Sequence, residues 1–169
     1  LLLFAGGGLF FYLDSIVKSG IEVVGSSVLG TAVTVDSVSL SPLSGQGRIS
    51  GLRVANPEGF ESQYAFELDS VLISIYVNSV FTDAAEIESI IIMQPIISYE
   101  TRIVSDNIRT LLAKLDGRDA ASSDPESADE SGQQIIIREL LMVDSQLNFV
   151  SSLVSASIKL ADIKIRDIG

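Results

Sequence analysis

The chain has 169 residues and carries 11 Lys and Arg against 22 Asp and Glu, which gives a formal net charge of −11. It contains no Cys and no His, which excludes disulfides, thiol nucleophiles, imidazole bases and metal sites built on Cys or His. The acidic balance argues against nucleic acids and anionic lipid headgroups as partners, because both are bound mainly through Lys and Arg. A mean hydropathy of +0.42 nevertheless indicates that part of the chain lies in an apolar environment.

Residues 1–13, LLLFAGGGLFFYL, carry no charge. As a helix they would be ~20 Å long, short of the ~30 Å hydrocarbon core of a bilayer. A signal-peptide core and a buried helix are alternatives, but no cleavage site is visible and three consecutive glycines make a poor soluble helix. We therefore expect the C-terminal part of a transmembrane helix, with these residues as the membrane anchor: Leu1, Leu2, Leu3, Phe4, Leu9, Phe10, Phe11, Tyr12 and Leu13.

Residues 14–30 have apolar side chains at helical spacing with charged residues between them, and Gly30 is a plausible helix stop. This pattern predicts a juxtamembrane amphipathic helix that continues the helix of residues 1–13 and leads out of the bilayer. From residue 31 the apolar residues alternate and are mostly β-branched, which predicts strands throughout residues 31–169.

A short unit repeats within these strands: apolar–x–apolar, two polar residues, then apolar–x–apolar, as in VTVDSVSL and FELDSVLI. The same kind of polar pair recurs between Ile87 and Ile90 and between Ile137 and Leu140. A β-bulge at the polar pair would keep both apolar pairs on one face and bend the strand. A row of such bulges predicts a mainly β fold with a curved, bulged antiparallel sheet that forms a groove. The alternative is a strand whose two ends face different layers.

Two segments interrupt the strand pattern. Residues 105–115, SDNIRTLLAKL, begin with a Ser of the type that caps helices and predict a short helix that plugs the sheet. Residues 116–132 contain six acidic residues, one Arg and no large apolar residue, and predict a disordered acidic loop. A cation site in this loop is disfavoured because the spacing of a calcium-binding loop is missing.

The sequence shows no catalytic constellation. Glu86 and Glu88 are a carboxylate pair beside a charged loop, with nothing that indicates desolvation. The serines have no His and no suitably placed Lys to activate them. We therefore predict no enzyme, no cofactor and no metal.

Residues 13–60 resemble the N-terminal segment of a known family. They run as an amphipathic helix ending in Gly-Thr, then V-x-V-x-x-V-x-L, a Gly-rich turn and G-L-x-V-x-N-P-x-G-F, which supplies Asn56, Pro57, Gly59 and Phe60. Later pieces fit as well: Tyr99-Glu100, Asn107 before a Leu-rich helix, and the closing LADIKIRDIG. Along most of its length the chain is similar to the AsmA-like proteins of the bacterial envelope.

The resemblance implies a single-pass protein of the inner membrane of a Gram-negative bacterium, with an apolar β-groove in the periplasm. It also implies a role in lipid traffic and outer-membrane homeostasis, with membrane lipids as partners. Six strands at ~4.8 Å spacing give a groove of about 30 Å, too short to bridge a periplasm alone.

Two functions follow as hypotheses. The first is lipid handling in the groove, lined by Val38, Leu40, Leu52, Val54, Val71, Ile73, Ile75, Ile90 and Ile92. For each of these residues the alternative is ordinary core packing against the helix of residues 105–115. The second function is that of a structural accessory, which docks onto a larger inner-membrane complex through the anchor helix or the sheet edges, or onto itself.

Overall fold

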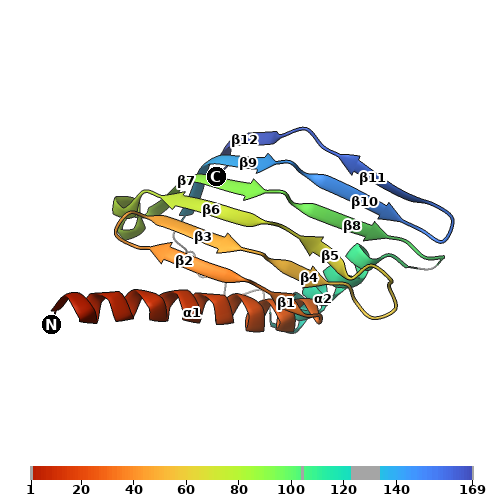
Figure 1. The fold of residues 1–169 in the computed structure, drawn as a ribbon, viewed down its shortest axis with the longest axis horizontal. Coiled ribbons are helices and arrows are strands. Elements are labelled where there is room, and N and C mark those ends of the chain that lie inside the picture. Colours follow the sequence, from red (N-terminus) through yellow and green to blue (C-terminus); the bar gives the residue numbers. More distant parts are fainter. Residues whose placement is uncertain (1, 104, 123–133, 169) are drawn as a thin grey trace.

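The computed structural model describes residues 2–103, 105–122 and 134–168, and the fold is mainly β (Figure 1). Two helices, one 3-10 helix and twelve strands follow one another in this part of the chain. They are α1 (Leu2–Leu29), β1 (Val33–Thr34), β2 (Ser37–Ser41), β3 (Gln46–Ser50), β4 (Arg53–Ala55), β5 (Tyr64–Glu67), β6 (Ser70–Ile75), η1 (Val77–Phe81), β7 (Ala84–Met93), β8 (Ile96–Glu100), α2 (Asn107–Ser122), β9 (Gln134–Val143), β10 (Gln146–Val150), β11 (Ser155–Lys159) and β12 (Ile163–Ile168).

The strands form two six-stranded sheets that lie end to end. Sheet A has the order β1-β4-β5-β8-β10-β11, and sheet B, read from its other end, has β2-β3-β6-β7-β9-β12. Each passage of the chain therefore supplies one strand to each sheet, with a joint of two or three residues between them. Hydrogen bonds continue across the row of joints, for example from the N–H of Gly51 to the carbonyl of Asp69 at 2.7 Å. Figure 1 accordingly shows one long, twisted surface.

The joints behave as the repeated unit predicts. In β1 and β2 the apolar residues Val33, Val35 and Val38 are buried, whereas the intervening Thr34, Asp36, Ser37 and Ser39 are exposed. The extra residue at the joint thus keeps both apolar pairs on one face. Three joint residues have positive φ, namely Gly51 (65°), Gln94 (50°) and Asp144 (53°).

The bulges predicted at Ile87–Ile90 and Ile137–Leu140 lie inside the long strands β7 and β9, whose joints between the two sheets come later, at residues 94–95 and 144–145. The predicted positions form a second irregular line, since Ser74 and Ile75 of β6 pair with Ser89 and Ile87 and skip Glu88. The sequence pattern therefore marked a real bulge but not the end of a strand.

The predicted antiparallel sheet is mixed. β7 pairs with β9, and β8 with β10, in parallel. The chain leaves the sheet after Glu100, passes through α2 and re-enters at Gln134 in the same direction. A parallel pair requires such a crossover, which the alternation of apolar residues does not reveal.

The two predicted N-terminal helical segments form one continuous helix, α1, as expected for an amphipathic segment that continues the first helix. Residues 2–13 and residues 14–29 belong to it, and no Pro or other breaker separates them. Within the residues that the structure describes, no helix is both long and apolar enough to cross a membrane. The predicted membrane span is therefore not confirmed. Of its anchor residues, Leu1 lies outside the described part, and the others belong to the first half of α1.

α2 begins later and ends later than predicted. Asp106, rather than Ser105, is its N-cap, because its Oδ1 accepts the N–H of Arg109 at 2.7 Å. The helix extends to Ser122, so residues 116–122 of the predicted disordered loop are helical. Residues 123–132 of that loop lie outside the described residues.

The best-packed part of the molecule is small and lies beneath the helices. Val33, Val54, Ala65 and Leu111 are buried together, with Ile21, Leu29, Leu52, Phe66 and Ile108 packed against them. This core joins sheet A to α2 and to the C-terminal half of α1. It leaves sheet B to be stabilised mainly by its own strand pairing and side-chain rows.

Candidate apolar binding face

One face of sheet B presents three rows of apolar side chains, two that cross all six strands and a third that crosses four. The strand register places them side by side, and no charged residue stands in any row. We call this surface the apolar face. Its rows are Val38-Ile49-Val71-Ile92-Met142-Ile163, Leu40-Gly47-Ile73-Ile90-Leu140-Ile165 and Ile75-Ile87-Ile137-Ile168.

The opposite face of the same strands is mixed. Its central row reads Ser39-Arg48-Leu72-Ile91-Leu141-Lys164. Lys164 there pairs with Glu139 at 2.7 Å, and Arg138 pairs with Glu86 at 2.9 Å. This face therefore carries polar and charged side chains that can be hydrated, whereas the apolar face carries none in its rows.

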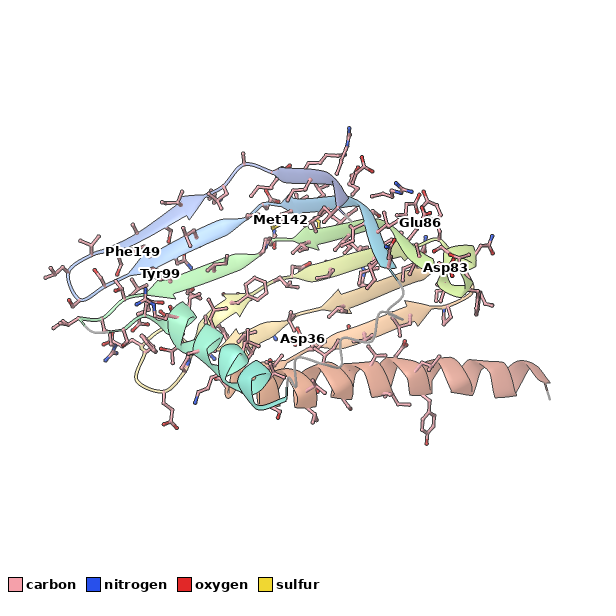
Figure 2. All side chains as sticks on the ribbon, turned by 180° about the vertical axis from the view of Figure 1, so that it is seen from behind. Asp36, Asp83, Glu86, Tyr99, Met142 and Phe149 are labelled. Carbon is pink, nitrogen blue, oxygen red and sulfur yellow. The ribbon has the colours of Figure 1, made fainter. Side chains whose placement is uncertain are left out.

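The described helices do not pack across the apolar face. The main helix contacts are those of α1 with β1, β2 and α2, and of α2 with β8. Figure 2 shows α1 along one edge and α2 over the end that β4, β5 and β8 form. Most residues of the apolar face are half-buried, and Ile163, Ile165 and Ile168 at its far side are exposed. In the described part of the chain this surface is thus broad, apolar and accessible.

A hollow of about 390 Å³ deepens one end of the apolar face. Leu40 and Ile73 form its floor, and η1 forms a wall with Val77, Val80 and Phe81. The volume falls within the range of small-ligand sites, which are mostly apolar concavities. The surface of the hollow consists almost entirely of apolar atoms, so it suits an alkyl chain better than a polar metabolite.

Gly45 shapes this hollow from the β2–β3 turn. Its φ is +68°, and a side chain there would collide with the backbone of Ile75. The carbonyl of Gly45 accepts the N–H of Ile75 at 2.8 Å, which ties the turn to the end of β6, two residues before η1. The two segments that border the mouth of the hollow are therefore held together.

The structure sorts the predicted lining residues into two groups. Leu52 and Val54 pack in the core with α2, so for them the alternative of core packing is correct. The remaining predicted residues lie in the rows of the apolar face: Val38, Leu40, Val71, Ile73, Ile75, Ile90 and Ile92. Ile49, Leu140 and Met142 join them through strand register, which the sequence did not supply. Phe81 was missed because η1 has no strand periodicity.

α1 closes one edge of the sheet with a stripe of polar side chains. Asp14, Glu22 and Ser26 accept the N–H groups of Leu40, Val35 and Val33 at 2.8, 2.9 and 2.8 Å. Lys18 donates to the carbonyl of Asp36 at 3.1 Å. These four residues are spaced by one helical turn, and their side chains replace the strand that would otherwise pair with β1 and β2. The opposite edge, β11 and β12, is exposed throughout.

Replacing Glu22 by Ala should lower the free energy of unfolding by about 1–3 kcal/mol, because it leaves the buried N–H of Val35 without an acceptor. Glu22→Gln keeps an oxygen at this position and should restore most of the loss. Urea denaturation of the two variants measures the difference. Equal stability of Glu22→Ala and the parent chain would show that the edge does not depend on this contact.

The motif residues Asn56, Pro57, Gly59 and Phe60 build a loop rather than a reactive site. Asn56 Oδ1 accepts Asn107 Nδ2 at 2.8 Å, and Asn56 Nδ2 donates to the carbonyl of Ser62 at 2.9 Å. Gly59 has a φ of +96°. The guanidinium of Arg102 lies 5.6 Å from the centre of the Phe60 ring, a cation–π contact. The motif therefore fastens the β4–β5 loop to β8 and α2.

Asn107 and Glu100 complete this buried polar cluster. Asn107 Nδ2 also donates to the carbonyl of Ser98 at 2.6 Å, and its Oδ1 accepts the N–H of Glu100 at 2.9 Å. The buried Glu100 carboxylate accepts the N–H groups of Glu61 and Ser62, each at 2.9 Å. Burial raises the pKa of Glu100, but these N–H donors and Arg102 outweigh it and hold the pKa below its ordinary value.

The carboxylates that the sequence raised as a pair do not act together. Glu86 is bound to Arg138, whereas Glu88 is exposed. In the described ranges, no three side chains of the metal-ligating types come together.

No protein-family model matches the chain, and no curated protein matches it at a significant level. The apolar face and the hollow are therefore the features of the described residues that bear on function.

Proposed function

We propose that the protein is a non-enzymatic lipid-handling protein, which holds an acyl chain along the apolar face of sheet B. The observation that carries the proposal is the set of three uncharged rows, two across six strands and one across four, with a carbon-lined hollow of about 390 Å³ at one end. An acyl chain is long, flexible and apolar, and gains about 0.8 kcal/mol for each CH₂ that leaves water. No polar group on the face would lose hydration on binding.

The resemblance to AsmA-like proteins supplies the setting of the proposal. In that setting the protein works at the inner membrane of a Gram-negative bacterium, with its β-domain in the periplasm and phospholipid as the ligand. The net charge of −11 favours recognition of the acyl chain over recognition of an anionic headgroup.

A charge placed in the middle row tests the proposal. Ile73→Asp should reduce the lipid retained by the full chain at least tenfold, because a carboxylate in the hollow must lose its hydration to an acyl chain. Ser74→Asp, the neighbouring residue on the opposite face, is the matched control and should retain lipid like the parent. Native mass spectrometry after incubation with phosphatidylcholine vesicles measures retention. Equal retention by both variants would refute binding on the apolar face.

The open β11–β12 edge favours a second candidate function, docking onto a larger membrane assembly as a structural subunit. Exposed strand edges accept an added strand from a partner. In mass spectra of protein extracted gently from its own membranes, this alternative predicts a fixed ratio to a larger complex and no retained lipid. Stoichiometric lipid on the free chain would instead support lipid handling.

A further inference from the structure

The end of sheet B that holds the hollow also carries exposed apolar side chains. Leu43 of the β2–β3 turn and Phe81 of η1 are each 87% exposed. Val80 and Tyr76 beside Phe81 are exposed as well. The Gly45–Ile75 hydrogen bond joins the two segments, and Pro42, Val80 and Phe81 line the hollow. The exposed residues therefore surround the mouth of the candidate lipid site.

Two segments at this end carry no charge, and Asp83 and Glu86, which Figure 2 also places at this end, lie outside them. Residues 41–46 and 76–82 contain neither acidic nor basic side chains. The first half of α1, residues 2–13, is also uncharged, and Figure 1 shows the N-terminus of α1 projecting beyond the β2–β3 turn. Tyr12 on this half of the helix is exposed. Uncharged loops with Leu, Phe and Tyr suit the interface of a bilayer, where apolar side chains leave water and aromatic rings meet the headgroups.

We propose that this end of the molecule, with Leu43 and Phe81 as its tips, inserts into the surface of a zwitterionic bilayer and opens the hollow to an acyl chain from it. The inference rests on the proposed function for the identity of the ligand. Attraction to anionic lipid plays no part, since no basic residue lies in either segment. The opposite end, with the loop after β8 and the β10–β11 turn, faces away from the bilayer in this arrangement.

Single cysteines test the orientation directly, because the natural chain has none. Leu43→Cys and Phe81→Cys place an environment-sensitive dye at the proposed tips. The matched controls Ile103→Cys and Leu153→Cys place it at the opposite end, where the native residues are 101% and 92% exposed. The full-length variants are labelled and mixed with phosphatidylcholine vesicles that contain spin-labelled lipid.

We expect blue-shifted emission and several-fold quenching at positions 43 and 81, with no change at 103 and 153. No quenching at positions 43 and 81, or equal quenching at all four positions, would overturn the inference. The Ile73→Asp result separates this inference from the proposed function. If the tips are quenched while Ile73→Asp retains lipid like Ser74→Asp, the membrane contact stands and binding on the apolar face fails. If Ile73→Asp alone loses lipid and the tips stay unquenched, binding stands and the membrane contact fails.

Discussion

Replacing Asn107 by Leu is expected to lower the free energy of unfolding by about 3 kcal/mol or more, the largest effect of any single substitution considered. Asn107 is 0% exposed and contacts Asn56, the Ser98 carbonyl and the N–H of Glu100. A Leu side chain removes all three hydrogen bonds from groups that are buried or half-buried, and each such loss costs about 1–3 kcal/mol. The β4–β5 loop, β8 and the start of α2 should loosen together, because this one amide joins them.

Urea denaturation followed by circular dichroism measures the effect. Asn78→Leu is the matched control, since Asn78 lies exposed on η1 and its substitution should change stability by no more than about 0.5 kcal/mol. If Asn107→Leu does not accumulate in folded form, Asn56→Ala removes one partner of the same cluster and should show a smaller loss. Stability of Asn107→Leu equal to that of Asn78→Leu would contradict the role assigned to the cluster.

Replacing Glu100 by Gln is expected to cost about 2–3 kcal/mol at neutral pH, because hydrogen bonds to a charged group contribute more than those to a neutral amide. The carboxylate accepts the N–H groups of Glu61 and Ser62 and lies 3.6 Å from Arg102. Glu61→Gln is the matched control. Its side chain is 85% exposed, and it pairs with the same Arg102 at 3.7 Å, so little stability should be lost.

The cost of Glu100→Gln should also depend on pH. The pKa of Glu100 is lower in the folded chain than its ordinary value near 4.5. Its ionised form therefore contributes stability that is fully present above that ordinary value and is lost as the pH falls through the folded pKa. The stability difference between the parent and Glu100→Gln should be constant from neutral pH down to about pH 5 and shrink below it. A difference independent of pH down to strongly acidic conditions would contradict the ionised state of Glu100.

Local patterns in the sequence predicted much of the fold. Period-two alternation identified the strands, and the repeated polar pair identified the joints that keep Val33, Val35 and Val38 on one face. The parallel strand pairs could not be predicted, because the sequence pattern of β7 does not depend on whether its partner β9 runs parallel or antiparallel to it. That direction depends on the path through α2, a long-range feature. The continuity of α1 could be predicted because helical spacing of apolar residues begins directly after residue 13.

The candidate site was predictable only where local pattern determines it. Ile73 and Ile90 lie in a β-branched run whose one-sided burial follows from alternation, and they pair in the middle row. Leu52 and Val54 have the same pattern but are covered by the helices, and only the tertiary arrangement separates the two cases. Asp14 and Glu22 belong to a stripe of polar residues spaced by one helical turn, and this spacing indicates a polar helix face. The sequence does not show that this face binds the backbone N–H groups of β2 and of the residues next to β1.

The proposed function requires an acyl chain to lie on the apolar face of sheet B. Photo-crosslinking tests this placement most directly: the full chain is incubated with a fatty acid that carries a diazirine on its alkyl chain, irradiated and digested for mass spectrometry. Adducts are expected in the peptides of β6 and β7, at Ile73, Ile75, Ile90 and Ile92, and should be lost in Ile73→Asp but not in Ser74→Asp. Adducts confined to the opposite face, at residues such as Leu72 and Ile91, or none on sheet B, would contradict it.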